Sequence, residues 1–299
     1  MTAPAAALGA LPARSAAPPP LGVRLAMATL AIIAVASVIA PCIAPGASEA
    51  MDLAARRAPP SLAHWFGTDE LGRDVMARVL VGARVSLAIA FLSALLSVAL
   101  GAAVGATGGF VRGWIDAALM RVTDAMLAIP RLPFLMIVAA IVQPSIPLLI
   151  ILVGAAGWME TARVVRAEVL SLATRGFVEA ARATGVSAPR VLVGHVLPNV
   201  MGTITVSATL AVGRGVLLES ALSFFGVGVQ PPAASWGNML YQAQTTLSSE
   251  PWLAVFPGMA IFVTVLCVNV LGEQVGGERV GGEWVGGERT PDAAISARQ

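Results

Sequence analysis

Long apolar stretches separated by short polar segments occupy most of the chain between residues 21 and 271. Each stretch is about 20 residues long, which is the length that a helix needs to cross the hydrocarbon core of a bilayer. The pattern therefore predicts an all-α integral membrane protein with six transmembrane helices. Their expected limits are Leu21–Ala44, Val85–Thr107, Ala117–Val142, Ser145–Val165, Leu197–Leu218 and Leu253–Leu271. Pro130 and Pro133 predict a kink in the third span, because proline removes a backbone donor and clashes with the preceding turn.

The composition agrees with this fold class and excludes several chemistries. Hydrophobic residues make up 57% of the chain and charged residues 12%, whereas a soluble domain typically carries about twice that charge. All 19 basic residues are arginine. A P-loop and a pyridoxal enzyme each need a lysine, so neither chemistry belongs to this chain. The net charge of +2 is too small to indicate a nucleic-acid partner.

The cysteines and histidines show no pattern typical of a reactive site. Cys42 and Cys267 lie near opposite ends of the chain, in or beside apolar segments, where cysteine usually behaves as a small hydrophobic residue. His64 and His195 are isolated from each other and from the cysteines. We therefore expect no catalytic residue, no metal site and no cofactor held by this chain.

The arginines predict the orientation of the spans. Six spans put both termini on one side, and with that side in the cytoplasm twelve arginines lie inside and five outside. The positive-inside rule favours this arrangement. The segment before the second span fits less well, because it holds all five outer arginines. The loop from Ser223 to Pro251 has no basic residue and fits the outer face.

A polar segment between the fourth and fifth spans has a helical pattern of its own. It begins Glu179-Ala-Ala-Arg-Ala-Thr-Gly185, in which the glycine ends one helical pattern. Ser187 and Pro189 are a typical start for the next helix. We therefore expect a helix, a tight turn and a second helix on the cytoplasmic side, and we weigh this against an ordinary charged loop.

Three motifs resemble a known family of transport proteins. Glu179-Ala-Ala181, Gly185 and Leu197-Pro198 match the spacing of the EAA loop in permease subunits of ATP-binding-cassette (ABC) importers. Two further segments resemble the dipeptide, oligopeptide and nickel branch, and in particular its C-type subunit. They are Gly67-Thr-Asp-Glu-Leu-Gly-Arg-Asp74 with Gly82-Ala-Arg-Val-Ser-Leu87, and Leu218-Glu-Ser-Ala-Leu-Ser-Phe-Phe-Gly226 with Gln230-Pro-Pro232 and Ser235-Trp-Gly-Asn238. The resemblance covers most of Leu21 to about Leu271.

The resemblance implies a type I importer permease fold in the inner membrane of the cell. Two permease subunits, expected to be a heterodimer, would enclose a path for peptides or for a related small solute such as nickel. Two separate ABC ATPase subunits would hold ATP and Mg, and an extracytoplasmic binding protein would deliver the solute. This chain would then be no enzyme itself.

The EAA loop is expected to dock on the ATPase, within a coupling loop at about residues 166–196. Small residues at 180, 181 and 183 would let the helix enter a cleft in the partner, while Glu179, Arg182 and Arg175 would fix its register through charge-assisted hydrogen bonds. Gly185 would supply the turn, and Pro198 marks the start of the fifth span. The predicted docking residues are Glu179, Ala180, Ala181, Arg182, Gly185 and Pro198.

Charged residues in the spans are candidates for the translocation path. Arg214 and Glu219 lie in or near the end of the fifth span, where ionisable groups usually face an interior or a water-filled path. Alternatively, they extend to the interface or pair with another span. Arg121 and Asp124 have the i,i+3 spacing of a structural ion pair.

The outer segments are candidates for a platform that receives the binding protein. Thr68 is expected to cap a helix with Asp69 and Glu70 in its first turn, and Ser235 to cap a helix that begins at Trp236. The predicted platform residues are Asp69, Glu70, Arg73, Asp74 and Trp236. The alternative for Trp236 and for Trp252 is a simple interfacial anchor.

The domain organisation follows from these segments. We expect a disordered cytoplasmic N-terminus (1–20), a first span with an outer segment (21–82), a permease core (83–272) and a low-complexity cytoplasmic tail (273–299). Gly-Gly pairs in the tail's Val-Gly-Gly-Glu repeats disfavour a stable helix there. The rival functions are an ion-coupled secondary transporter, for which the spans offer few carboxylates, and a membrane enzyme, for which no catalytic cluster is visible.

Overall fold

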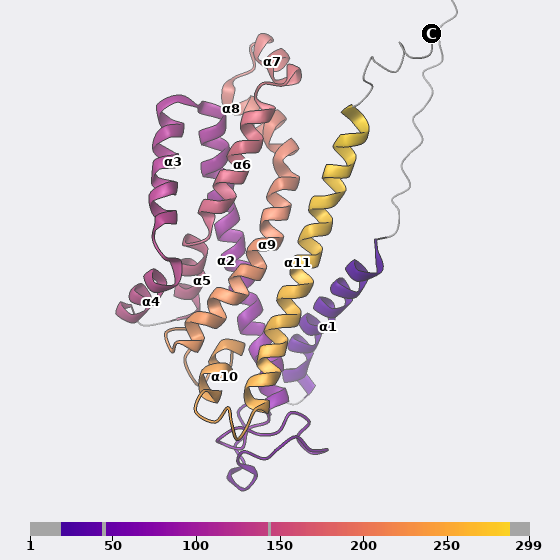
Figure 1. Ribbon diagram of the computed structural model, residues 1–299, viewed down its shortest axis with the longest axis vertical. Coiled ribbons are helices and arrows are strands. Elements are labelled where there is room, and N and C mark those ends of the chain that lie inside the picture. The colour runs from indigo at the N-terminus through magenta and orange to yellow at the C-terminus, as the bar shows by residue number, and fades with distance from the viewer. Residues whose placement is uncertain (1–18, 44–45, 143–144, 288–299) are drawn as a thin grey trace, which may run out of the picture.

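The structure is a computed structural model that describes residues 19–43, 46–142 and 145–287. Long helices lie side by side in a bundle, with short elements at both of its ends (Figure 1). The helices are α1 (Leu21–Ile43), α2 (Val75–Val111), α3 (Gly113–Ala128), α4 (Arg131–Ile141), α5 (Ile146–Ala155), α6 (Trp158–Leu172), α7 (Gly176–Ala183), α8 (Ala188–Val191), α9 (Leu197–Phe224), α10 (Trp236–Ala243) and α11 (Trp252–Gly287). A 3₁₀-helix, η1 (Leu53–Ala55), and a π-helix, η2 (Leu192–Val196), complete the described elements.

The described helices contain five segments that are long and apolar enough to cross a membrane. They are Leu21–Ala40, Val75–Val111, Ile146–Leu172, Ala188–Phe224 and Trp252–Gly276. The pair α3 and α4 becomes a sixth if it is one span bent by 83°. The bend lies at Pro130, because the residue before a proline is driven out of the helical region, and Ile129 accordingly has extended backbone angles. Pro133 lies in the first turn of α4, where proline is tolerated.

The second span begins earlier than its apolar run. Asp74 caps α2, and its carboxylate accepts a hydrogen bond of 2.8 Å from the Ala77 backbone N–H. The domain boundary expected between residues 82 and 83 therefore falls inside α2. The expectation that Thr68 caps a helix is wrong, because its buried hydroxyl instead accepts from the Ala58 N–H and donates to the Ala55 carbonyl.

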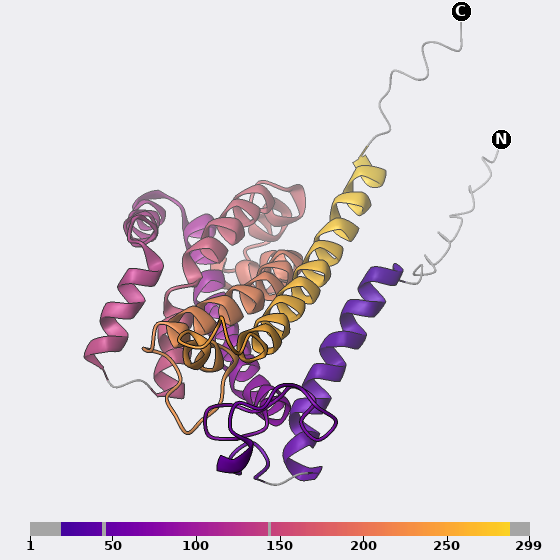
Figure 2. The same ribbon diagram turned by 60° about the horizontal axis from the view of Figure 1, so that its bottom comes forward.

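Helix α2 is the central element of the bundle and packs against α1, α5, α6 and α9. Its contact with α6 is close because Gly101, Gly105 and Gly109 recur at i,i+4 spacing on one face. A Cβ atom at Gly109 would lie 2.9 Å from the Arg166 carbonyl oxygen of α6. Such stripes of small residues let membrane helices approach backbone to backbone. Helices α1 and α11 lie at one edge of the bundle, and α3 and α4 at the opposite edge (Figures 1 and 2).

Helix α11 differs from the expectation for the tail. It continues through the Val-Gly-Gly-Glu repeats to Gly287, although Gly-Gly pairs disfavour a new helix there. The physical reason is that extending an existing helix avoids the cost of nucleation, so each glycine adds only about 1 kcal/mol. The expectations for residues 1–18 and 288–299 lie outside the described residues.

Candidate coupling and translocation sites

Helix α7 projects beyond one end of the bundle (Figure 1). Its apolar face is buried: Val178 has no exposed surface and Ala181 is 9% exposed. Both belong to a core cluster that includes Phe110 of α2 and Val169 of α6. Glu179 and Ala180 lie on the opposite, exposed face. The short helix is therefore fixed to its own chain on one side and open on the other.

A second contact fixes α7 to the end of α2. The Arg182 guanidinium lies over the Phe110 ring, 5.0 Å from the ring centroid, in a cation–π arrangement. Arg182, which was expected to fix the register of α7 on a partner, therefore also makes a contact within its own chain. The expectation that Ala181 faces the partner is wrong, because it shares the buried face with Val178, three residues earlier on the helix. Ala180 and Ala183 are exposed.

The turn after α7 has the expected form. Gly185 has a φ of +79°, a left-handed conformation that glycine adopts without a steric penalty. Its backbone N–H donates to the Arg182 carbonyl at 3.0 Å, and the next N–H, that of Val186, donates to Ala181 at 3.3 Å. These bonds satisfy the last carbonyls of α7. Helix α8 then begins after Ser187 and runs through η2 into α9, so that Pro198 lies in the first turn of α9.

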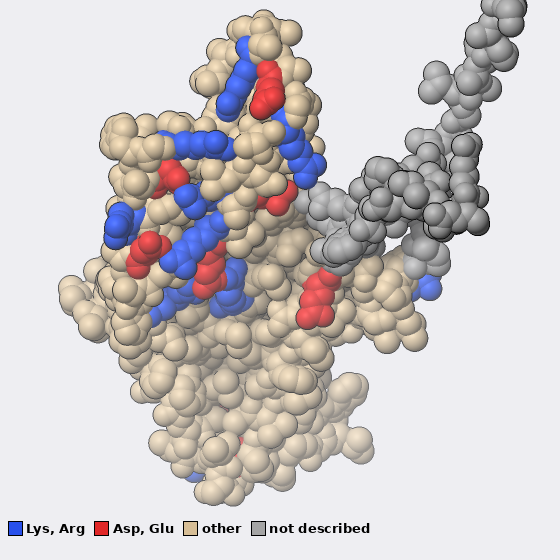
Figure 3. Space-filling model, turned by 45° about the horizontal axis from the view of Figure 1, so that its top comes forward, with Lys and Arg blue, Asp and Glu red and all other residues tan. Residues whose placement is uncertain are grey.

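Charged side chains gather over the half of the molecule that carries α7, whereas the other half is almost uncharged in the view of Figure 3. Two ion pairs on this half join α3 to α6. Asp116 accepts two hydrogen bonds from Arg166, at 2.5 and 2.6 Å, and Asp124 pairs with Arg163 at 2.5 Å. The expected pair of Arg121 with Asp124 is therefore wrong, because an arginine of the neighbouring helix takes that carboxylate.

Arg214 of α9 forms an ion pair that joins three helices. It contacts one carboxylate oxygen of Glu160 in α6, and Arg131 of α4 contacts the other oxygen at 2.9 Å. The three side chains are between 23% and 41% exposed. Arg131 and Glu160 also line a cavity of about 310 Å³ whose other walls are apolar. Glu160 was not singled out from the sequence, although an acidic residue within the apolar run Ser145–Val165 was a signal.

Glu219 lies inside the protein rather than on an open path. Its side chain is fully buried, and its two oxygens accept hydrogen bonds from the hydroxyls of Ser86 at 2.9 Å and Ser223 at 2.8 Å. The Ser86 hydroxyl in turn accepts from the Trp236 backbone N–H at 3.2 Å. The network therefore holds α2, α9 and α10 together at the end of the bundle opposite α7.

Most of the predicted platform residues are also buried. Asp69 accepts a hydrogen bond of 2.7 Å from Arg73 and lies 3.6 Å from the guanidinium of Arg78, and all three are buried. Asp74 is half-buried, where it caps α2 and bonds to His64 at 3.0 Å. Among the five predicted platform residues, Glu70 is exposed.

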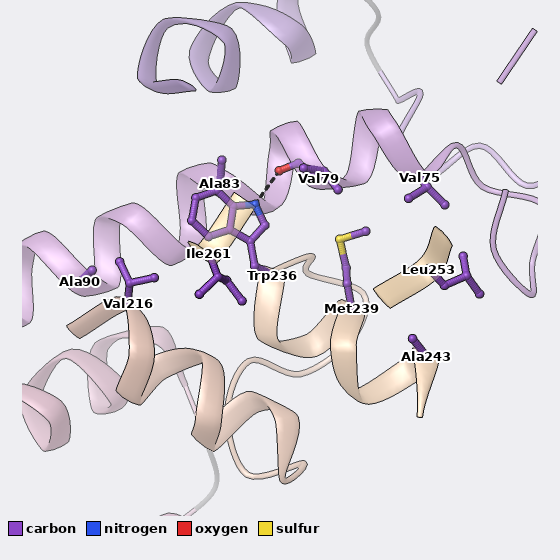
Figure 4. Packing of buried hydrophobic residues seen from close by; sticks show 10 residues of the cluster. All are labelled: Val75, Val79, Ala83, Ala90, Val216, Trp236, Met239, Ala243, Leu253 and Ile261. Carbon is purple, nitrogen blue, oxygen red and sulfur yellow. Dashed lines mark hydrogen bonds between the residues drawn. The ribbon is translucent and has the colours of Figure 1, made fainter. Parts of the chain in front are cut away.

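Trp236 follows the same pattern, and it is neither exposed nor an interfacial anchor. As expected, Ser235 caps α10 at its start. The tryptophan ring is fully buried among apolar side chains of α2, α9 and α11, and its indole N–H donates to the Val79 carbonyl at 3.0 Å (Figure 4). A buried indole usually finds such a partner, because an unpaired N–H is costly. Packing therefore accounts for this residue, which holds α10 against α2.

The described residues thus form a bundle of helices long and apolar enough to span a membrane, with a projecting amphipathic helix and no group of metal-binding side chains. The chain belongs to the family of binding-protein-dependent transport system inner membrane components, whose family model matches residues 97–276. This match confirms the resemblance to ABC importer permeases, the helical membrane fold and the inner-membrane, multi-pass location.

Curated relatives agree with the family. A protein of Brucella suis biovar 1, provisionally named a peptide permease protein, is 40% identical over 224 residues, which cover 74% of each chain. The glutathione transport system permease protein GsiD of Escherichia coli O6:K15:H31 is 42% identical over 213 residues, which cover 71% of this chain and 70% of that protein. The protein of the same name in Shigella sonnei matches equally well. The function of an importer permease is therefore confirmed, and the ion-coupled alternative finds no support.

Proposed function

We propose that this chain is one subunit of a heterodimeric permease that imports peptides, with ATP and Mg bound by two separate ABC ATPase subunits and solute delivered by an extracytoplasmic binding protein. The relatives support a peptide solute, because one is named for peptides and another for glutathione, which is itself a peptide. Under this proposal the chain holds no cofactor and catalyses no reaction of its own.

The geometry of α7 is the observation that carries the proposal. A subunit without a nucleotide site needs a mechanical contact through which an ATPase can move it. Helix α7 has such a form, because Val178 is buried in a cluster shared with α2, α6 and α9 while Glu179 and Ala180 remain exposed. A partner that moved the exposed face would therefore move the ends of several spans.

The same proposal places α7 and both termini in the cytoplasm. Twelve arginines lie in the segments on that side, against five on the other. Figure 3 shows basic side chains on the end of the molecule that carries α7, as the positive-inside rule expects of the cytoplasmic side. Labelling of a cysteine placed at Arg182 with a membrane-impermeant reagent tests it, and reaction in intact cells would contradict it.

We expect Gly185→Val to uncouple ATP hydrolysis from uptake. Nothing lies within 4 Å of a Cβ atom at this position, so the effect is conformational rather than a collision. A left-handed conformation costs a residue other than glycine about 1–2 kcal/mol, and a β-branched residue such as valine is a genuine outlier there. The turn would therefore rearrange and shift α7. The measurement compares peptide uptake with ATPase activity in the assembled importer.

Gly185→Asn is the matched control, because asparagine tolerates the left-handed region. We expect near-normal uptake with asparagine, and with valine a loss of uptake on the order of tenfold, at an unchanged amount of protein in the membrane. Coupled uptake in the valine variant equal to that of the native chain would refute the assignment of α7 as the coupling element.

A further inference from the structure

The cluster of Arg131, Glu160 and Arg214 has one positive charge too many for an internal ion pair. Two guanidinium groups share a single carboxylate, one on each of its oxygens. The neighbouring ion pairs are balanced, since Asp124 takes one arginine and Asp116 another. An arginine stays charged in proteins, and an uncompensated charge within a membrane-spanning bundle is costly. The cluster is therefore suited to a further anionic partner.

The surplus charge lies beside a cavity. The cavity of about 310 Å³ has Arg131 and Glu160 in its wall, together with apolar residues of the α3–α4 bend and of α6. A mainly apolar cavity with a few convergent polar groups is the usual form of a small-molecule site. Arg214 is not among the residues that line this cavity, but it contacts the carboxylate of Glu160, which is. Charged residues of α4, α6 and α9 thus meet beside the cavity at the Pro130 bend.

We propose that this cluster, Arg131 and Arg214 with Glu160 between them, binds the carboxylate of the transported solute during its passage. The inference rests on the proposed function, because it specifies the class of solute carried. Arginine suits this role, since its planar fork of N–H groups matches a carboxylate in two parallel hydrogen bonds. The solute carboxylate would take donors of one guanidinium, while Glu160 holds the other arginine in place.

Thiol modification in the cavity tests the charge directly, without any transport. Ile129 lines the cavity and is 44% exposed, so Ile129→Cys places a reactive group there. The background carries Cys42→Ser and Cys267→Ala, which removes both native thiols. The assembled importer in membranes is treated with an anionic sulfonatoethyl or a cationic trimethylammoniumethyl methanethiosulfonate. The readout is the rate of modification by the anionic reagent divided by the rate for the cationic reagent, normalised to the same quotient for a small free thiol. A value above one is an anionic preference.

Opposite charge changes should move this ratio in opposite directions. We expect Arg131→Gln to lower the anionic preference on the order of tenfold and Glu160→Gln to raise it. Arg84→Gln, which changes an exposed arginine outside the cluster, should leave it unchanged. If the cluster does not set the potential in the cavity, neither cluster variant will change the ratio. That result, or a ratio of one in the native chain, would overturn the inference.

Uptake of two matched probes tests the solute class. Dialanine has a free carboxylate and dialanine amide does not, and each variant is compared with the native chain for the same probe, so the preference of the binding protein cancels. We expect Arg131→Gln to lower dialanine uptake on the order of tenfold while amide uptake changes less than about twofold. Arg131→Lys, which keeps the charge, should restore part of the loss.

The two proposals fail in different ways. If the native importer takes up both probes and Arg131→Gln lowers both equally, the carboxylate site is wrong and the peptide permease stands. If the native importer takes up neither probe although its ATPase responds to another solute, the peptide assignment fails. The modification ratio then still decides whether the cluster attracts an anion, and a ratio insensitive to Arg131→Gln rejects the site as well.

Discussion

Replacement of Gly105 by leucine is expected to lower the amount of this chain in purified membranes at least several-fold, because marginally folded proteins are degraded. A Cβ atom at this position would lie 3.0 Å from the Arg166 backbone nitrogen of α6 and closer still to the Ala162 carbonyl oxygen. These obstacles are main-chain atoms, so no side chain can rotate to make room. Overpacking in a well-packed core typically costs about 1–3 kcal/mol, and this position belongs at the upper end.

Ala103→Leu is the matched control for this substitution. Ala103 lies on the same helix, two residues away, but its side chain is exposed in the described structure. Leucine there gives the same final side chain without approaching α6, so we expect a normal amount of protein. Immunoblotting of membranes and size-exclusion chromatography in detergent measure the two variants. Equal yields would show that the close approach of α2 and α6 is dispensable.

Glu219→Ala is expected to destabilise the end of the bundle opposite α7. The substitution removes the acceptor of the Ser86 and Ser223 hydroxyls, both of which are buried. Each buried donor left without a partner costs about 1–3 kcal/mol. Because Ser86 also accepts from the Trp236 N–H, the loss extends to the position of α10. We expect a lower midpoint of thermal aggregation for the purified protein in detergent.

Two further variants separate the network from a general effect of truncation. Glu219→Gln keeps one acceptor oxygen and should fall between the native chain and the alanine variant. Leu217→Ala truncates an exposed residue of the same helix, 49% of whose surface is accessible, and should change the midpoint little. A midpoint for Glu219→Ala equal to that of Leu217→Ala would mean that the buried carboxylate contributes no stability.

The sequence predicts the fold better than the sites, and the reason is physical. Apolar run length locates the spans, and the glycine and proline positions locate the turn at Gly185 and the bend at Pro130. The start of α2 was missed because its first ten residues include two arginines, Arg78 and Arg84, of which Arg78 is buried in the folded chain. The burial of Arg78 beside Asp69 is invisible to a hydropathy pattern.

Contacts between helices account for the other differences. Glu160 meets Arg131 and Arg214, which are 29 and 54 residues away, and helical periodicity carries no information about such encounters. The same holds for Trp236, whose indole reaches Val79 across the bundle. Residue type and spacing indicated that ionisable groups in spans matter, whereas the choice of partner depends on how the helices pack.

Helix α7 has one face that packs inside the chain and one face that is free to bind another protein. Val178 and Ala181 are constrained by packing inside the chain, whereas Glu179 and Ala180 are exposed and constrained only by a protein that binds this face. If α7 docks on an ATPase subunit as proposed, substitutions on its exposed face should change which ATPase is accepted without disturbing the fold. A chimaera that takes only these exposed residues of α7 from a homologous transporter would test whether they determine which ATPase binds.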